Sequence, residues 1–378
     1  MNADVHVAKF HQEVQEAFAG HLDRQMRLVA RNFIQNALEG LRDQAMASAW
    51  NRRDPQRHDH RNGYYARTLS SLYGPLDLRI PRCRRVPLDT WIIFDRYQRR
   101  MTDVDRIIRH AFLLGASTRG SAELAEQVFG GSLSPQSISN LMKALDDDLA
   151  AYRRRPVEDC YPVVHIDGMY VHMLGQERTA LMIVLGAKED GTKDVLGFCV
   201  GAGESCGDLL KDLHDRGLKT VRLFVSDDSG PVRAAIAEHY PEAPWQYCTV
   251  HRLADLRKKI GDEPYRDQMV QDAACIFRCP SKPAAVDAAV LWAKDWKAIN
   301  PYAVQCFLEN LSDSLSFYEL PKDWWRRIRT NNPLERMIRT LRIRLRPMNC
   351  FANVAAVERA IFGQLARWHL LPRLTQDT

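Results

Sequence analysis

The sequence lacks any apolar run close to the roughly 20 residues of a membrane-spanning helix, and its N-terminus shows no signal-peptide pattern. It also lacks a disulfide framework, because its nine cysteines are odd in number and scattered along the chain. We therefore expect reduced thiols, a cytoplasmic location and no membrane partner. With 46% hydrophobic and 26% charged residues among 378, the composition is that of a folded protein with two or three domains.

Net charge is modest at +6, but the basic residues are clustered. Nine lie between Lys322 and Arg346, where Asp323 and Glu335 are the only acidic residues. A second cluster, from Arg52 to Arg67, contains five arginines and two histidines. Clusters of this kind are typical of a protein with a polyanionic partner.

Three acidic residues occupy unusual positions. Asp167 interrupts the β-branched run 163–171, although a buried carboxylate is costly unless it is paired or binds a metal. Asp227 follows the apolar strand predicted for 221–225, and Glu335 lies near the start of an arginine-rich helix. Two carboxylates on strands and one on a helix suit a site with two Mg²⁺ or Mn²⁺ ions that transfers phosphoryl groups.

Other interpretations of these polar residues stay open. With Asn332 as N-cap and Pro333 at the first helical position, Glu335 would be third, where a glutamate completes a capping box. His165 shares a strand face with Asp167 and is expected to be a hydrogen-bonded core histidine. The cysteine and histidine spacing roughly fits a zinc site, but the segments look helical or strand-like, so zinc is disfavoured. Its four candidate ligands are Cys248, His251, Cys275 and Cys279.

The N-terminal part divides into three expected segments. Residues 1–50 are predicted to be helical, with an apolar stripe at steps of three or four that either faces a core or mediates dimerisation. The stripe consists of Phe10, Val14, Phe18, Leu22, Met26, Val29 and Phe33. Residues 51–100 form a basic loop and a hairpin turning at 74–75, and 101–155 form three short helices resembling a helix-turn-helix.

The rest of the chain is predicted to be an α/β domain. Three strands followed by strand–helix alternation over 156–252 indicate a mixed sheet with helices on its faces. An all-helical insertion is expected over 253–320. The helix with the third acidic residue follows in 321–347, and a last helix lies in 348–378.

Several short motifs recur in an order that resembles a known family. Their order, with 60 residues from Asp167 to Asp227 and 108 from Asp227 to Glu335, resembles the Mutator-type transposases of bacterial insertion sequences, a branch of the DDE recombinases. The resemblance covers nearly the whole chain. The motifs are Arg61-Asn62-Gly63-Tyr64, Gly74, Ile80-Pro81-Arg82, Gly115 to Arg119, Phe129-Gly130, Asp167-Gly168, Ser226-Asp227, Cys248 with His251, and Arg329 to Arg336.

This resemblance implies a ribonuclease-H-like catalytic core in which Asp167, Asp227 and Glu335 bind two metal ions, with the all-α segment as an insertion domain. It implies supporting roles for the residues around them, which are Asp228, Cys248, His251, Asn331 and Asn332. Asp228 departs from the family pattern, which usually has glycine at this position, and is an alternative to Asp227 as the metal ligand. We favour Asp227 because it lies at the strand end and shares a face with Val221, Leu223 and Val225.

The resemblance further implies a transposase that cleaves and joins double-stranded DNA at terminal inverted repeats and in target DNA. Such an enzyme works as a homodimer or higher oligomer near the nucleoid, without a nucleotide cofactor. A regulator that no longer cuts and a stand-alone nuclease are the alternatives. The expected DNA contacts are Arg52, Arg53, Arg61, Tyr64, Arg67, Arg82, Arg84, Arg85, Arg119, Gln136, Ser137, Asn140, Lys143, Trp325, Arg326, Arg327, Arg329, Arg336, Arg339 and Arg342.

Overall fold

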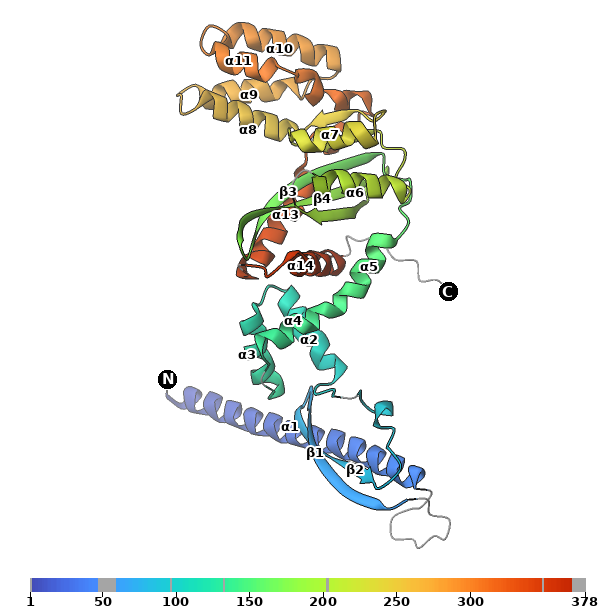
Figure 1. The fold of residues 1–378 in the computed structure, drawn as a ribbon. Coiled ribbons are helices and arrows are strands. Elements are labelled where there is room, and N and C mark those ends of the chain that lie inside the picture. The colour runs from blue at the N-terminus through green and yellow to red at the C-terminus, as the bar shows by residue number, and fades with distance from the viewer. Residues whose placement is uncertain are drawn as a thin grey trace. The chain divides into compact units, whose positions relative to one another are not determined.

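The structure, a computed structural model, describes residues 2–46, 59–95, 97–131, 133–201, 204–348 and 350–368. The chain forms two compact units, Met1–Lys143 and Ala144–Thr378 (Figure 1). Arg52 and Arg53 lie outside the described residues. In the part of the chain that is described, no helix has the length and apolar character needed to cross a membrane.

The first unit contains a long helix and a hairpin. Helix α1 spans Asn2–Ala45, and the antiparallel strands β1 (Arg61–Ser71) and β2 (Gly74–Cys83) follow. The hairpin turns at residues 72–73, just before the expected position, and Gly74 has the positive φ of 98° that glycine accepts without strain. One 3₁₀ turn, η1 (Thr90–Ile92), lies beyond it. The core between helix and hairpin contains Leu38, Leu69, Leu76, Leu78, Ile80 and Phe94.

The apolar stripe of α1 does not face this core, so the expectation of a core-facing stripe is wrong. Ala30, Ile34 and Leu38 pack on the hairpin instead. The described stripe residues, from Val14 to Phe33, are between 38% and 76% exposed. Phe10 is outside the described side chains.

Three short helices complete the first unit, as expected. These are α2 (Thr102–Leu113), α3 (Thr118–Phe129) and α4 (Pro135–Met142), with the 3₁₀ turn η2 (Lys143–Leu145) at their end. The last two helices each begin at a serine N-cap: Ser117 accepts a hydrogen bond from the Gly120 amide and Ser134 from the Ser137 amide. Their buried residues include Val104, Ile108, Ala125, Phe129 and Ile138.

The second unit is built on a five-stranded mixed sheet, which confirms the expected mixed sheet. Its strands are β3 (Val163–Met173), β4 (Gln176–Ala187), β5 (Lys193–Val200), β6 (Leu223–Ser226) and β7 (Trp245–Tyr247). The strand order is β5-β4-β3-β6-β7. The first three pair antiparallel, whereas β6 is parallel to both β3 and β7.

Helices cover both faces of this sheet (Figure 1). On one face, α6 (Glu204–Asp215) and α7 (Gly230–His239) pack over a core that includes Val164, Ile166, Leu210, Phe224 and Ile236. The other face packs against 317–328, which contains the end of the 3₁₀ turn η4 (Ser316–Glu319) and the short helix α12 (Trp325–Ile328). Helix α13 (Asn332–Leu345) also contacts β3.

The remaining elements are helical. Helix α5 (Asp146–Arg154) leads into the sheet, and α14 (Val354–Arg367), after the turn η5 (Arg346–Met348), packs against α5 and β5. The insertion between β7 and α13 is helical, as expected, and has its own core around Met269, Trp292 and Phe307. Its elements are α8 (Thr249–Ile260), α9 (Arg266–Ile276), α10 (Lys282–Trp296), α11 (Pro301–Leu308) and the turn η3 (Leu311–Ser314).

Candidate active site

The parallel ladder between β3 and β6 aligns two of the three candidate carboxylates. It ends with His165 opposite Val225, and continuing this register by two residues beyond the ladder would place Asp167 level with Asp227, whose charge acts on Asp167. Asp167 is buried and Asp227 half-buried. Val221, which was expected on the face of Asp227, precedes β6 and packs in the core on the opposite face.

The residue after Asp167 is a glycine because a larger side chain would not fit there. A Cβ at Gly168 would lie 2.6 Å from Met182 Sδ and 3.0 Å from the Leu181 carbonyl oxygen on the neighbouring strand β4. The amide of Gly168 also donates a hydrogen bond of 2.8 Å to Asp167 Oδ1. This residue therefore lets β4 approach closely and orients the carboxylate beside it.

Asn331 attaches the start of α13 to β3. Its side-chain amide donates to the Ile166 carbonyl oxygen at 2.9 Å, so its Oδ1 accepts from His165 Nδ1 at 3.0 Å. Its backbone amide donates to Cys248 Sγ at 3.2 Å. His165, Cys248 and Asn331 are all buried. These contacts confirm His165 as a hydrogen-bonded core histidine and fix where the helix bearing Glu335 begins.

Glu335 does not complete a capping box. The N-cap of α13 is Asn331, one residue earlier than expected, and its side chain makes no capping hydrogen bond. The helix therefore begins at Asn332, and Glu335 is its fourth residue rather than its third. Within the described structure, Glu335 Oε1 is buried without a hydrogen-bond partner. A buried carboxylate oxygen in that state is costly, and a bound cation would offset the cost.

Glu335 lies close to His251, the residue at the third position of α8. The distance from His251 Nδ1 to Glu335 Oε1 is 3.9 Å. Ligand atoms of these two residues and of Cys248 all lie within 4.8 Å of one another, a spacing that suits a metal ion. This group excludes Cys275 and Cys279, whose thiols contact backbone carbonyl oxygens within their own helical segment.

The site concentrates negative charge away from water. The pKa of Asp167 is raised to about 6, mainly by burial and also by the charges of Asp227 and Glu335, although the Gly168 amide and His251 oppose this. The pKa of Asp227 is also raised, mainly by burial. Contact with Cys248 raises the pKa of His251 to about 9 with help from Asp167 and Glu335, although burial opposes this. A cation bound between such buried, mutually repelling carboxylates would stabilise their charged forms.

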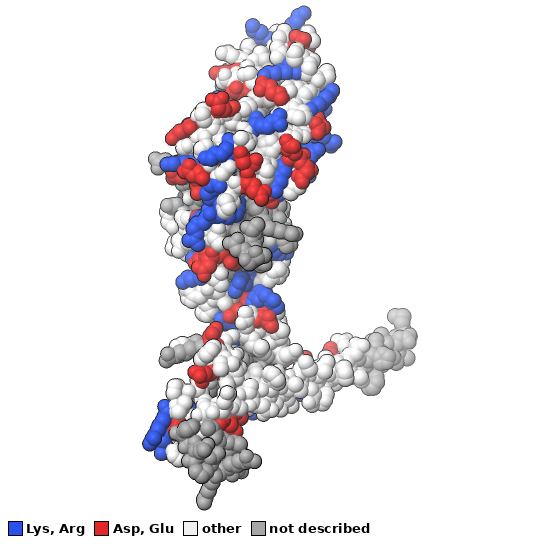
Figure 2. Space-filling model, turned by 90° about the vertical axis from the view of Figure 1, so that its right-hand side faces the viewer, with Lys and Arg blue, Asp and Glu red and all other residues white. Residues whose placement is uncertain are grey.

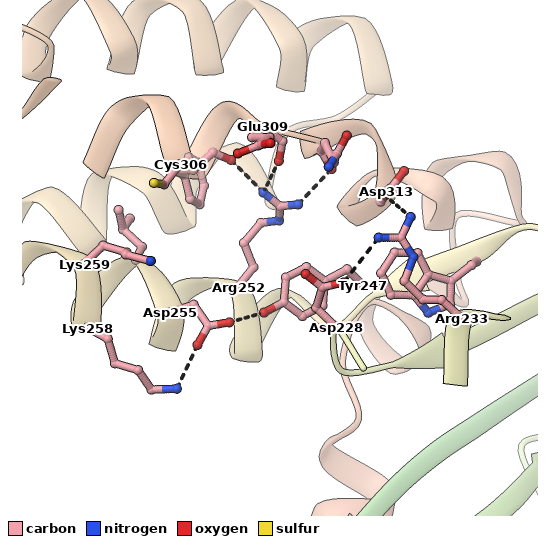
Figure 3. Close-up of a pocket in the computed structure, with 14 residues that line it drawn as sticks. Asp228, Arg233, Tyr247, Arg252, Asp255, Lys258, Lys259, Cys306, Glu309 and Asp313 are labelled. Atoms are coloured by element: carbon pink, nitrogen blue, oxygen red, sulfur yellow. Dashed lines mark hydrogen bonds and ion pairs between the residues drawn. The ribbon is translucent and has the colours of Figure 1, made fainter. Parts of the chain in front are cut away.

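Asp228 points into a different environment. It lines a pocket of about 360 Å³ between α7, α8 and the end of α11 (Figure 3). Its Oδ1 lies 3.3 Å from an Arg233 guanidinium nitrogen, and Arg233 also contacts Asp313 at 3.4 Å. Asp228 is exposed, whereas its neighbour Asp227 is half-buried and close enough to His251 for their charges to interact.

One residue of this pocket was missed by the sequence analysis. Arg252 is buried, and its guanidinium donates hydrogen bonds to four oxygens at the end of α11 and in the residues that follow it (Figure 3). These are Phe307 O at 2.6 Å, Glu309 O at 3.1 Å, Asn310 O at 2.8 Å and Ser314 Oγ at 2.6 Å. Arg252 thereby attaches the end of the insertion to the helix that carries His251. No sequence signal marks such an arginine, since three of its four acceptors are backbone carbonyls and all four lie 55 to 62 residues away.

The expected DNA contacts of the second unit divide into two groups. Arg336, Arg339 and Arg342 are exposed on α13, opposite its buried face, and Arg326 and Arg327 are also exposed. Two others are engaged inside the protein. The Arg329 guanidinium donates to the Phe277 carbonyl oxygen at 2.8 Å, and Trp325 Nε1 donates to the Leu320 carbonyl oxygen at 2.8 Å.

The expected contacts of the first unit also divide. Tyr64 accepts a hydrogen bond from Arg42, Arg61 forms an ion pair with Asp43, and Arg67 donates to backbone carbonyls. Ser137 belongs to the cap of α4, and Gln136 donates to Asn140. Among the expected contacts of this unit that the structure describes, the exposed basic residues are Arg82, Arg84, Arg85, Arg119 and Lys143.

Fold and site together define a mixed α/β protein with an acidic cluster on its central strands and a helical insertion before the helix that adds a third carboxylate. Residues 2–369 match the family described as "Transposase, Mutator family". The chain belongs to this family. It is 32% identical over 355 residues to the transposase of insertion sequence element ISRM5 from Rhizobium meliloti, covering 91% of this chain and 87% of that protein.

Two further relatives have the same kind of name. The transposase of IS1201 from Lactobacillus helveticus is 28% identical over 292 residues, covering 76% of this chain and 79% of that protein. The transposase of IS1081 from Mycobacterium tuberculosis is 26% identical over 354 residues, covering 91% and 84%. These matches confirm the family that the sequence motifs indicated.

Proposed function

We propose that the protein is a DNA transposase that cleaves the ends of an insertion sequence and joins them to target DNA with Asp167, Asp227 and Glu335 as metal-binding residues. The observation that carries this proposal is the buried Glu335 Oε1, which has no hydrogen-bond partner among the described residues, beside a strand pair that aligns Asp167 with Asp227. Family membership supports the activity.

The residues present fit a divalent cation. The three carboxylates supply the hard oxygen ligands that Mg²⁺ and Mn²⁺ prefer, and the pKa is raised in two of them, Asp167 and Asp227. Two such ions would activate the attacking oxygen and stabilise the leaving one. Cys248 and His251 adjoin Glu335, so a softer metal at this corner is the competing possibility.

The chain's own residues would position the carboxylates and the DNA. Asn331, held by His165 and Ile166, sets the start of α13 and thus the position of Glu335. The exposed arginines on that helix, Arg336, Arg339 and Arg342, would contact phosphates next to the cleaved bond. His251 would carry positive charge beside the phosphate when no metal adjoins it.

We further propose a ribonuclease-H-like arrangement for the second unit. Its support is the strand order β5-β4-β3-β6-β7, in which three antiparallel strands are followed by two parallel ones. The first unit, with its exposed basic residues and a capped α4, would recognise the terminal repeats. Because two DNA ends must be held together, we propose a homodimer as the smallest working assembly.

The test is strand cleavage and joining on a labelled duplex taken from the DNA that flanks the coding sequence, with Mg²⁺ or Mn²⁺. Asp167→Asn and Glu335→Gln are expected to abolish both reactions while DNA binding persists. If Glu335→Gln retains full activity, the third ligand is wrong. Binding by the wild type without cleavage would favour the regulator, and cleavage without joining would favour a nuclease.

A further inference from the structure

Helix α1 has two opposite faces, and the structure uses only one of them. Arg27 Nε donates to the Tyr73 carbonyl oxygen at 2.8 Å, and Arg31 Nε donates to that of Asp77 at 3.1 Å. Gln35 exchanges hydrogen bonds with the Arg79 backbone. These contacts and the packed side chains fix the rotation of α1 about its axis. The helix therefore cannot roll to bury its other face.

That other face carries the exposed apolar stripe. Phe18 is 68% exposed, Val29 63% and Phe33 76%, and Val14, Leu22 and Met26 complete the row. At 3.6 residues per turn these six positions fall on one side of the helix, opposite the side that packs on the hairpin. Isolated exposed apolar residues are ordinary, but a continuous row of large ones marks an interaction surface.

The stripe is also free of charge. On the side of the stripe, residues 14–36 contain no Lys, Arg, Asp or Glu, and the polar residues there are Gln15, His21, Gln25, Asn32 and Asn36. The charged residues of this stretch project from the other side and include Glu16, Asp23, Arg24, Arg27 and Arg31. Figure 2 shows the projecting part of α1 as a nearly white surface, in contrast to the mixed charges elsewhere on that face.

The spacing of the stripe is self-complementary. About a midpoint between residues 23 and 24, Val14 mirrors Phe33 and Phe18 mirrors Val29, while Leu22 and Met26 mirror the polar residues Gln25 and His21. Two antiparallel copies of α1 would therefore place each phenylalanine against a valine, which is the alternation of large and small side chains that packs well. Phe18 and Val29 are eleven residues apart, as are Leu22 and Phe33, and this spacing is close to three full turns, so the members of each pair lie on the same side of the helix.

We propose that the stripe of α1 is the surface through which two copies of this chain associate, with the two α1 helices antiparallel. The interface is isologous, because the same residues of both copies meet about a two-fold axis. The proposal rests on the homodimer of the proposed function and names its interface. A face without Lys, Arg, Asp or Glu suits this partner, since an identical face brings none of these charges against one another.

The test is the mass in solution of the full-length chain at micromolar concentration, by light scattering after size exclusion. The wild type is expected at twice the 43.4 kDa of one chain. Phe18→Glu combined with Val29→Glu is expected to halve that mass, because these two positions face each other across the axis. A matched control is Val290→Glu, since Val290 on α10 is 64% exposed, much like Val29, and should leave the dimer intact.

Orientation is tested by oxidative cross-linking. Phe18→Cys combined with Val29→Cys is expected to give covalent dimers well above the wild-type background, whereas Phe18→Cys alone should not. Efficient cross-linking of Phe18→Cys alone would overturn the antiparallel arrangement. A monomeric wild type, or a dimer that survives the glutamate pair, would overturn the interface. Mass and cross-linking do not depend on DNA cleavage, so failure of the proposed activity would be recognised separately.

Discussion

His165 and Asn331, which are 166 residues apart in sequence, are joined by a buried hydrogen bond of 3.0 Å. The same Asn331 side chain also donates a hydrogen bond to the Ile166 carbonyl oxygen. Both polar atoms of its amide group, the oxygen and the nitrogen, are therefore hydrogen-bonded to β3. Asp167 is the next residue of β3, and Glu335 is four residues beyond Asn331. One asparagine therefore sets the distance between the first and third carboxylates of the candidate site.

Replacing Asn331 should loosen this connection. Asn331→Ala leaves the Ile166 carbonyl oxygen and His165 Nδ1 buried without partners, so we expect a loss of about 2–4 kcal/mol in the free energy of unfolding. Denaturant unfolding of the metal-free protein measures it. The matched control is Asn332→Ala, because Asn332 is exposed at the first position of α13. A loss of equal size in both variants would show that Asn331 contributes only to helix initiation.

The stability of the protein in acid should depend on two buried groups whose effects on the free energy of unfolding have opposite signs as the pH falls. Burial lowers the pKa of His165 to about 4 from 6.5, so between these values the unfolded chain binds the extra proton and stability falls with falling pH. Burial raises the pKa of Asp167 to about 6 from 3.8, so over that range the folded chain binds the extra proton and stability rises with falling pH. Each effect is on the order of 3 kcal/mol, and together they nearly cancel.

Single substitutions should expose each effect. Between pH 6.5 and 4 in EDTA, Asp167→Asn is expected to lose stability more steeply than the wild type, because the contribution of Asp167 that opposes that of His165 is removed. His165→Gln should lose less stability than the wild type, or gain, because the contribution of Asp167 is then no longer opposed by that of His165. The measurement is the denaturation midpoint of each variant against pH. Parallel curves for all three proteins would contradict the assigned pKa shifts.

These contacts explain which features of the fold and of the candidate site could be predicted from the sequence and which could not. Strand alternation and turn residues predicted β3, β4 and the capped α3 and α4, because those signals are local. The position of Glu335 in its helix was predicted one residue too early, because the N-cap is decided by Asn331 binding to β3 rather than by its own capping geometry. The stripe of α1 was expected either to face a core or to mediate dimerisation, because periodicity shows that a face is apolar but not what covers it.

Arg252 offers a third prediction. Arg252→Met removes a buried guanidinium that satisfies four oxygens, and we expect a loss of about 3 kcal/mol or more in unfolding free energy together with faster proteolysis in 253–320. Arg252→Lys should recover little, because one ammonium cannot match the planar fork. The control is Arg257→Met on the same helix, where the guanidinium forms an exposed ion pair with Asp267 at 2.7 Å. Equal proteolysis of both variants would contradict the role of Arg252.

Asp227 and Asp228 give the sharpest comparison at the site, since they are adjacent and chemically identical. Asp227 lies level with Asp167 and is half-buried beside His251, whereas Asp228 is exposed and paired with Arg233. Asp227→Asn should reduce metal-dependent cleavage by more than the roughly 10–100-fold that is typical of residues that only support metal ligands. Asp228→Asn should change it only a few-fold, because the exposed pair with Arg233 contributes little.

The readout is single-turnover cleavage across a range of Mn²⁺ concentrations, with DNA binding measured in parallel. Loss of activity in Asp227→Asn at every Mn²⁺ concentration, with intact DNA binding, is expected for a lost ligand. If Asp228→Asn is instead the inactive variant, the strand end must turn by one residue when DNA binds, and the register that aligns Asp167 with Asp227 would not be that of the working site.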